Sequence, residues 1–177
     1  MNPKLLSDEI IYSGRVFDLT LARIREGDVE YRREIIRHRG SAVIVPVFDD
    51  LSVALVRQYR HAAGEDLLEI PAGALEEGES PLIGAKRELE EEIGVTARSW
   101  EKLTAFYVSP GFLDELMHVF LASDFTETAQ RLDADEFLRV ERYSFDSLLE
   151  MIRSGEIRDA KTICGVTLAA SRFGKTI

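Results

Sequence analysis

The sequence predicts a mixed α/β (α+β) fold in which helices cover both faces of a mixed sheet. Three observations predict it. Apolar, β-branched runs at residues 41–48 and 52–59 have the length and composition of buried strands. One helical run, residues 81–93, lies between strand patterns, and two more, 144–154 and 159–172, close the chain. With 177 residues, 45% of them hydrophobic, the chain can bury one full core.

The first 39 residues read as a small antiparallel sheet that precedes this core. Strand patterns occur at residues 9–12, 17–25 and 29–37, and a turn at Glu26-Gly27-Asp28 joins the last two. Because such a sheet is too small to stand alone, we expect it to pack on the rest of the chain or on a second copy. We therefore expect two units, residues 1–39 and residues 40–177.

Turn signals bound the remaining strands of the core. Asp49-Asp50 separates the first two runs, and Ser109-Pro110-Gly111 separates two later ones. These further strand patterns lie at residues 67–70, 100–107, 117–122 and 136–143.

The helix at residues 81–93 has signals at both ends. Ser80 can cap its start, Pro81 suits the first helical position, and Gly94 can close it. At roughly 100° per residue, one apolar stripe faces the core. The stripe consists of Leu82, Ala85, Leu89 and Ile93. Glu88 and Glu92 fall beside it, which places carboxylates at the rim of the buried face.

Acidic side chains are concentrated along one edge of this helix. Glu88, Glu91 and Glu92 are three and four residues apart and so share a face. Like charges at this spacing cost about 0.2 to 0.5 kcal/mol per pair, and a bound divalent metal would reverse that sign. The alternative is an ordinary solvated acidic face with surface pairs such as Lys86 with Glu90.

The spacing of residues 73–95 favours the metal site over the solvated face. Every specified position of the 23-residue box of the Nudix hydrolases is filled, so the stretch resembles that family without a gap. A chance match is on the order of one in a million or rarer. The positions are Gly73, Glu79, Arg87, Glu88, Glu91, Glu92 and Gly94. The resemblance implies a Nudix α/β/α sandwich over residues 40–177, with the small N-terminal antiparallel sheet in front.

The resemblance also implies a metal-dependent hydrolase of a nucleoside diphosphate joined to a further group. Glu88 and Glu92 would be the principal ligands, with Glu91 and the Ala72 carbonyl as additional ones. Hard oxygen donors suit Mg²⁺ or Mn²⁺, and more than one ion is expected. Arg87 would act in catalysis by orienting the glutamates through charge-assisted hydrogen bonds.

The catalytic base is expected in the acidic loop Asp133-Ala134-Asp135-Glu136. Glu136 is the first candidate, either deprotonating the attacking water or holding a metal, and Asp135 is the second. Some relatives carry an acidic residue where this chain has Ala134. The alternative is a mobile acidic loop without a function.

The substrate is narrowed by a second motif. Pro110 stands 16 residues after Gly94, between Ser109 and Gly111, and this resembles the ADP-ribose pyrophosphatases. The resemblance implies a homodimer that exchanges its N-terminal sheets. The substrate-binding residues would be Phe17, Arg33 and Glu34 around adenosine, Arg60 on phosphate, Ser109, Pro110 and Gly111, and Glu115 at the terminal ribose or a metal. Asp159-Ala160-Lys161-Thr162 belongs to the same resemblance without an assigned role.

Two alternatives to ADP-ribose hydrolysis remain open. The substrate could be another nucleoside diphosphate sugar, because the box does not select one. The chain could also be a nucleotide sensor that does not cleave, although a pure binder has no need for clustered like charges. Phe17 could equally be a core side chain on its strand.

Composition excludes several classes of function. The net charge is −10 and Lys plus Arg number only 22, which argues against a nucleic-acid groove. No apolar run approaches the ~20 residues that span a bilayer. The single cysteine, Cys164, and a start, Met1-Asn2-Pro3-Lys4, without the apolar core of a signal peptide lead us to expect a cytoplasmic protein.

Overall fold

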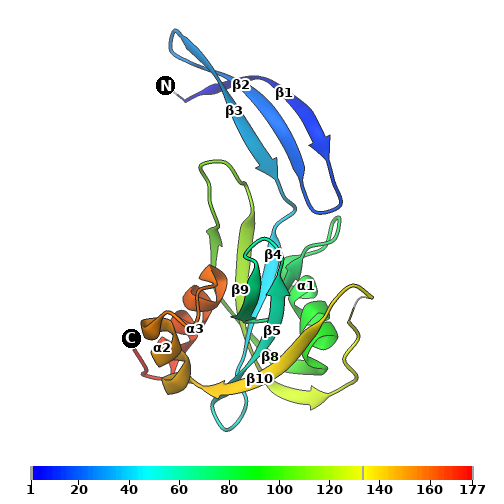
Figure 1. The fold of residues 1–177 in the computed structure, drawn as a ribbon, viewed down its shortest axis with the longest axis vertical. Helices are drawn as coiled ribbons and strands as arrows, with labels where there is room; N and C mark the ends of the chain where they lie inside the picture. Colours follow the sequence, from blue (N-terminus) through cyan, green and yellow to red (C-terminus); the bar gives the residue numbers. More distant parts are fainter. Residues whose placement is uncertain (1, 133, 177) are drawn as a thin grey trace.

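A computed structural model describes residues 2–132 and 134–176. It shows a mixed α+β body with a three-stranded sheet standing above it (Figure 1). The mixed fold expected from the sequence is confirmed.

The upper sheet consists of the N-terminal strands in the order β1-β2-β3, all antiparallel. Its strands are β1 (Lys4–Ser13), β2 (Asp18–Glu26) and β3 (Val29–Arg37), so β1 begins earlier than the sequence pattern indicated. The sheet is tied to the body where Ile36 exchanges backbone hydrogen bonds with Phe112 (2.8 Å) and Asp114 (3.1 Å). These bonds bring β3 beside the Ser109–Asp114 loop.

The body is built on a four-stranded mixed sheet in the order β7-β4-β9-β8. Its strands are β7 (Ala72–Ala74), β4 (Ser41–Pro46), β9 (Leu116–Glu127) and β8 (Val95–Tyr107). The central pair, β4 and β9, is parallel. The expectation missed β7, because three residues around a glycine leave no hydrophobic pattern to read.

A second, antiparallel sheet follows the order β10-β5-β6, with β10 (Leu138–Ser144), β5 (Ser52–Arg60) and β6 (Glu65–Glu69). Strand β4 is buried on both faces. Val43 and Val45 pack with helices α2 (Phe145–Ser154) and α3 (Ala160–Arg172), whereas Ala42 and Ile44 pack with the box helix. Two cores therefore sandwich the mixed sheet, as in Figure 1.

The box helix differs from the expectation in its second half. It begins as α1 (Pro81–Glu88) and continues as the π-helix η1 (Leu89–Ile93), which ends at Gly94 with φ 73°. Ser80 stands at the N-cap position but makes no side-chain capping bond. Leu82 is 38% exposed, so its place in the apolar stripe is wrong. No helix in the described part of the chain is long and apolar enough to cross a membrane.

Candidate active site

Glu88 and Glu92 are buried inside the molecule. Their residues are 7% and 3% exposed, so the expectation that they lie at the rim of the buried face is wrong. For Glu92 the π-helix supplies a physical reason, because a residue in its wider turn advances by less than the 100° used for an α-helix. Glu88 ends α1 and is instead covered by β7, where Gly73 lets its carboxylate approach the backbone. Such π turns are rare and occur frequently at functional sites. The carboxylates are therefore already withdrawn from water.

Gly73 makes room for one of these carboxylates. A Cβ atom on Gly73 would stand 1.9 Å from Oε1 of Glu88, far inside van der Waals contact. Gly73 does not have a positive φ, so a glycine is needed here because it lets the Glu88 carboxylate approach the backbone, and not because of its conformational freedom. The short strand β7 thus carries a gap into which the Glu88 side chain fits.

Arg87 links the acidic side chains of the box. Its Nη1 donates to Glu88 (2.6 Å) and Glu91 (2.9 Å), and its Nε and Nη2 donate to Glu79 (3.1 and 3.0 Å). Nη2 also donates to the carbonyl of Ala74. One guanidinium therefore orients three carboxylates, as expected from the sequence, with Glu79 as a structural partner.

Burial raises the pKa values of both inner carboxyls. The pKa of Glu88 rises to about 7 and that of Glu92 to about 8, in each case chiefly because the charged form loses water. The charge of Glu136 adds to both shifts, and Glu88 adds to that of Glu92. For Glu92, the N–H of Ala72 and the charge of Arg60 act in the opposite direction. A cation bound here would offset the repulsion between these carboxylates.

Of these carboxylates, Glu88 faces a pocket of 240 Å³. Glu136 lines it together with Gly73, Arg87, Glu88 and Glu91. The first candidate for the base is thus beside Glu88 and Glu91 of the box, although 45 residues or more separate it from these two in sequence. The second candidate, Asp135, is turned toward Arg15 at 3.3 Å on the surface. Asp133 lies outside the described residues.

Comparison with known proteins assigns the family. The sequence profile of the NUDIX domain matches residues 37–164. The chain belongs to the Nudix family. It is 41% identical over 165 residues to an ADP-ribose pyrophosphatase of Bacillus subtilis (strain 168), covering 92% of this chain and 89% of that protein. It is 36% identical over 171 residues to the methanol dehydrogenase activator of Bacillus methanolicus, covering 92% of each.

A solved structure confirms the Nudix sandwich. The crystal structure of an ADP compounds hydrolase superimposes with a TM-score of 0.86, covering 98% of this chain and 95% of that chain. Its sequence is 22% identical, so the likeness shows the fold alone. The resemblance and the fold class read from the sequence are both confirmed.

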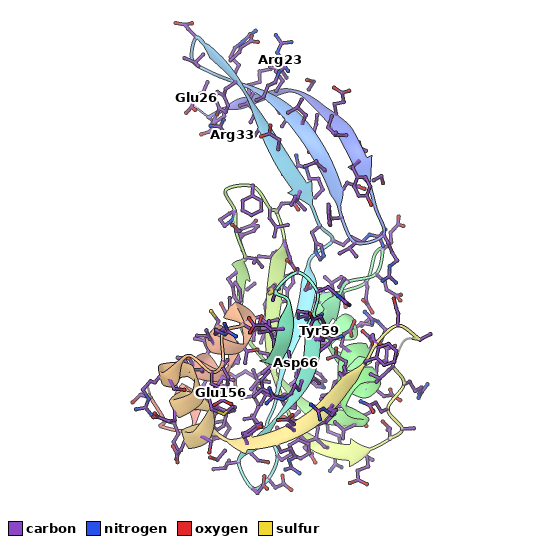
Figure 2. All side chains as sticks on the ribbon, in the orientation of Figure 1. Arg23, Glu26, Arg33, Tyr59, Asp66 and Glu156 are labelled. Carbon is purple, nitrogen blue, oxygen red and sulfur yellow. The ribbon has the colours of Figure 1, made fainter. Side chains whose placement is uncertain are left out.

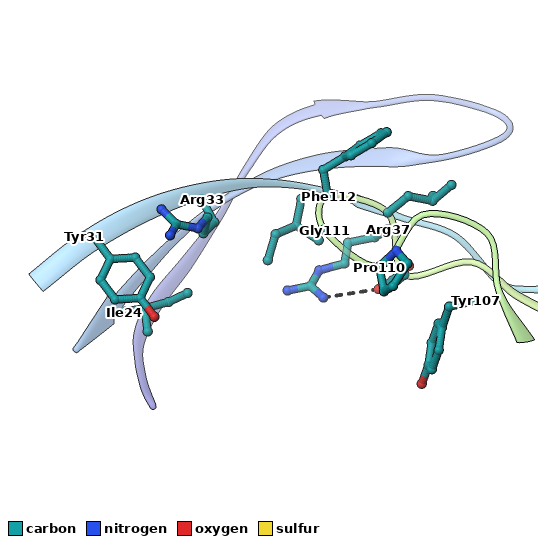
Figure 3. A pocket seen from close by; sticks show the side chains of 11 residues that line it. Ile24, Tyr31, Arg33, Arg37, Tyr107, Pro110, Gly111 and Phe112 are labelled. Atoms are coloured by element: carbon teal, nitrogen blue, oxygen red, sulfur yellow. Dashed lines mark hydrogen bonds and ion pairs between the residues drawn. The ribbon is translucent and has the colours of Figure 1, made fainter. Parts of the chain in front are cut away.

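A second pocket of this Nudix chain, of 390 Å³, lies between the N-terminal sheet and the Ser109–Asp114 loop (Figure 3). It brings together three of the expected substrate-binding residues, Arg33, Pro110 and Gly111. The sequence analysis did not single out two others that line it, Tyr31 and Arg37, and gave no role to Phe112, which follows Gly111. Arg37 is held there by ion pairs to Asp8 (2.8 Å) and Asp114 (3.1 Å).

The other expected substrate-binding residues are spread over the chain. Phe17 is 39% exposed in the β1–β2 turn, and Glu34 is exposed on β3. The Ser109 carbonyl accepts backbone bonds from Phe112 and Leu113. Glu115 accepts a 2.5 Å bond from Ser41. Figure 2 shows Arg33 on the N-terminal sheet, apart from Tyr59 and Asp66 in the body.

The donor set fits divalent metal ions, which Nudix pyrophosphatases generally use. Glu88, Glu91 and Glu92 supply hard oxygen atoms, and two of them are buried with repelling charges. As the side chains stand, no three acidic, histidine or cysteine side chains among the described residues are grouped closely enough to share an ion. Arg87 holds Glu88 and Glu91, and the Ala72 N–H holds Glu92 at 3.1 Å.

Arg60 does not line the carboxylate pocket. Its Nε and Nη2 donate to the two oxygens of Glu69, each at 2.7 Å, and Glu69 also accepts from Lys161. The sequence analysis did not find Glu69. A lone glutamate at the end of an apolar run was its only signal, and the partner Lys161 is 92 residues away.

Proposed function

We propose that the protein hydrolyses the pyrophosphate of ADP-ribose to AMP and ribose 5-phosphate. The observation that carries this proposal is the pair of buried box carboxylates, Glu88 and Glu92, beside a pocket that Glu136 also lines. The identity of 41% with an ADP-ribose pyrophosphatase over 92% of this chain supports the choice of substrate.

Glu88, Glu92, Glu91 and the Ala72 carbonyl would hold the metal, which we propose is Mg²⁺ or Mn²⁺ and more than one ion. Bound there, the ions would neutralise phosphate charge and lower the pKa of a water molecule. Arg87 orients Glu88 and Glu91 through the bonds from its Nη1. A mobile water needs a general base within hydrogen-bonding reach, and a pocket-lining carboxylate meets that need.

Glu136 is our proposal for that group, either accepting the proton of the attacking water or holding a metal. The water oxygen forms a bond to one phosphorus, the bridging P–O bond breaks, and the leaving phosphate keeps the electron pair. Its position on the pocket wall supports this role, since Asp135 is paired with Arg15 instead.

For the substrate, we propose that the N-terminal pocket with Arg33, Pro110 and Gly111 belongs to the adenosine side. Phe17, Glu34 and Ser109 would add to it from the same region. Arg60 would contact phosphate, and Glu115 the terminal ribose or a metal. Aromatic faces that stack on a base and arginines that pair with phosphate supply the chemistry for this division.

Incubation of the purified protein with ADP-ribose and Mg²⁺ or Mn²⁺ tests the proposal. AMP and ribose 5-phosphate should form in equal amounts. Tight binding of intact ADP-ribose without turnover would instead identify a sensor. Comparing kcat/KM for ADP-ribose, GDP-mannose and UDP-glucose decides between ADP-ribose and another nucleoside diphosphate sugar.

We also propose a homodimer in which residues 1–39 act as an exchanged appendage to a Nudix domain of residues 40–177. Exposed apolar side chains on the N-terminal sheet support it, among them Ile10 (62%), Ile11 (55%) and Val29 (63%). Chromatographic mass at dilute concentration tests the dimer. A cytoplasmic location stays a prediction, which cell fractionation would check.

A further inference from the structure

A buried ion cluster joins helix α3 to the strand that leads into the active site. Glu69, at the end of β6, is 1% exposed and Lys161, in the first turn of α3, is 8% exposed. Both oxygens of Glu69 are engaged, since one accepts from Arg60 and the other accepts from Arg60 and Lys161. Charges this deeply buried are costly unless they are paired and hydrogen-bonded.

The cluster fixes one edge of the Arg60 guanidinium. The bidentate contact uses Nε and Nη2, so Nη1 points away from Glu69. The Arg60 side chain remains 40% exposed, and its charge acts on Glu92 in the carboxylate site. A guanidinium with one edge anchored in protein and the other directed outward suits recognition of a phosphate oxygen.

Lys161 has a specific task in this cluster, because it binds the same carboxylate as Arg60. Lys161 supplies a second cation to Glu69, and the two cations hold the pKa of Glu69 below its usual value although burial alone would raise it. Asp159, 3.1 Å from Lys161, accepts a bond from the Thr162 N–H at the start of α3, where the helix dipole favours a negative charge.

The same turn of α3 holds the backbone that enters the site. The Thr162 hydroxyl accepts a 2.9 Å bond from the N–H of Ile70 and donates a 2.6 Å bond to Asp159. Ile70 follows Glu69 directly and precedes Ala72 by two residues. Glu69, and through it Arg60, is thus held at a fixed position relative to the box carboxylates.

We infer that Glu69 and Lys161 are positioning residues that hold Arg60 toward a phosphate of the substrate. This inference rests on the proposed function. It gives a role to the Asp159-Ala160-Lys161-Thr162 segment, which the substrate pocket leaves unused.

Steady-state kinetics with ADP-ribose and Mg²⁺ test the inference through Lys161→Met, which keeps the apolar stem and removes the charge. KM should rise about tenfold while kcat stays within about threefold, because binding to a phosphate contributes equally before and during the reaction. Lys161→Arg should recover most of that loss. The matched control is Lys175→Met, which breaks the surface pair of Lys175 with Asp146 at the other end of α3 and should leave KM unchanged.

A double-mutant cycle distinguishes positioning from general support of the fold. If Lys161 acts through Arg60, then Lys161→Met should add nothing to KM in an Arg60→Ala background. Additive effects, or an unchanged KM in Lys161→Met, would overturn the inference. Glu69→Gln enters the same cycle if Lys161→Met does not fold by its melting curve. If the wild-type protein released no AMP, both the proposed function and this inference would be wrong. If the wild type turned over ADP-ribose normally and Lys161→Met left KM unchanged, only the inference would be wrong.

Discussion

The carboxylate pocket and the N-terminal pocket are built in opposite ways. The first is lined by Glu88 and Glu91 of the box, which Arg87 joins by hydrogen bonds, together with Gly73 and the distant Glu136. The second lies between two segments far apart in sequence, residues 24–37 and 107–114. It borders a sheet that exposes Ile10, Ile11 and Val29 to solvent.

The two pockets therefore differ in whether a single chain forms the complete site. In the carboxylate pocket, Arg87 fixes Glu88 and Glu91 by hydrogen bonds within the same chain. The N-terminal pocket keeps apolar surface beside it uncovered, which is typical of a site that a partner or a ligand finishes. We therefore expect substitutions in the first pocket to affect turnover and those in the second to affect substrate binding.

Glu92→Gln should cause the largest loss of turnover. The amide fits the same space but removes the buried negative charge that a metal ion needs. Because even indirect partners of metal ligands contribute about 10- to 100-fold, kcat should fall by at least about 100-fold. Glu150→Gln, on the exposed face of α2, is the matched control and should keep full activity. A Glu92→Gln protein of normal rate would show that the ligand assignment is wrong.

The substitutions Gly73→Ala and Gly111→Ala compare the two pockets by the same change. In Gly73→Ala, the added methyl would stand 1.9 Å from the Glu88 carboxylate, and kcat should fall at least about tenfold as that side chain is pushed aside. Since only the end of a flexible side chain must move, the melting temperature should change little. Gly111→Ala meets nothing within 4 Å in the N-terminal pocket and should give a far smaller loss. Equal losses at both positions would remove the distinction.

Arg33→Ala tests the binding role of the N-terminal pocket. Arg33 lies over the ring of Tyr31, 4.4 Å from its centroid, and lines the pocket wall. Its removal should raise KM for ADP-ribose about three- to tenfold and leave kcat nearly unchanged. Arg32→Ala, one position along β3 and hence on the other face of the strand, is the control. A fall in kcat with constant KM would contradict the assignment of this pocket to binding.

The smallest effect concerns stability in the absence of metal. The folded-state pKa of Glu92, about 8, lies above its ordinary value of 4.5. The folded chain therefore holds a proton that the unfolded chain has lost between these values, and stability must fall as pH rises through that window. Glu88, with a pKa of about 7, acts in the same direction.

Thermal unfolding in a chelator measures this effect. Glu92→Gln should flatten the decline and melt about 4 °C above wild type at pH 8. Mg²⁺ should then stabilise the wild type more than the variant. A wild-type melting temperature that rises between pH 5 and pH 8 would show that other groups dominate.

The sequence predicts the parts of this molecule that depend on local spacing. Apolar, β-branched runs located the core strands β4 and β5, and the box located Glu88, Glu91 and Glu92. It could not predict the π turn at Leu89–Ile93, because hydrophobic spacing assumes one helical period. The burial of Glu88 was missed because it depends on a tertiary contact, the close approach of its carboxylate to Gly73.

Contacts between segments that are distant in sequence cannot be predicted from hydrophobic patterns. The Glu69–Lys161 pair joins residues 92 positions apart, and Arg37 meets Asp114 across 77. The N-terminal pocket also depends on how β3 meets the Ser109–Asp114 loop, which no periodicity encodes. Arg33, Pro110 and Gly111 were found through the family resemblance and not through their neighbours.

Arg87 has a consequence for the order in which the protein matures. Its guanidinium already donates to Glu79, Glu88 and Glu91, so part of the negative charge of the acidic cluster is offset before any ion arrives. A newly synthesised chain can thus complete its fold without waiting for a metal, unlike small zinc domains that collapse when deprived of theirs. Loading becomes a late and reversible event, governed by the free ion supply around a finished scaffold.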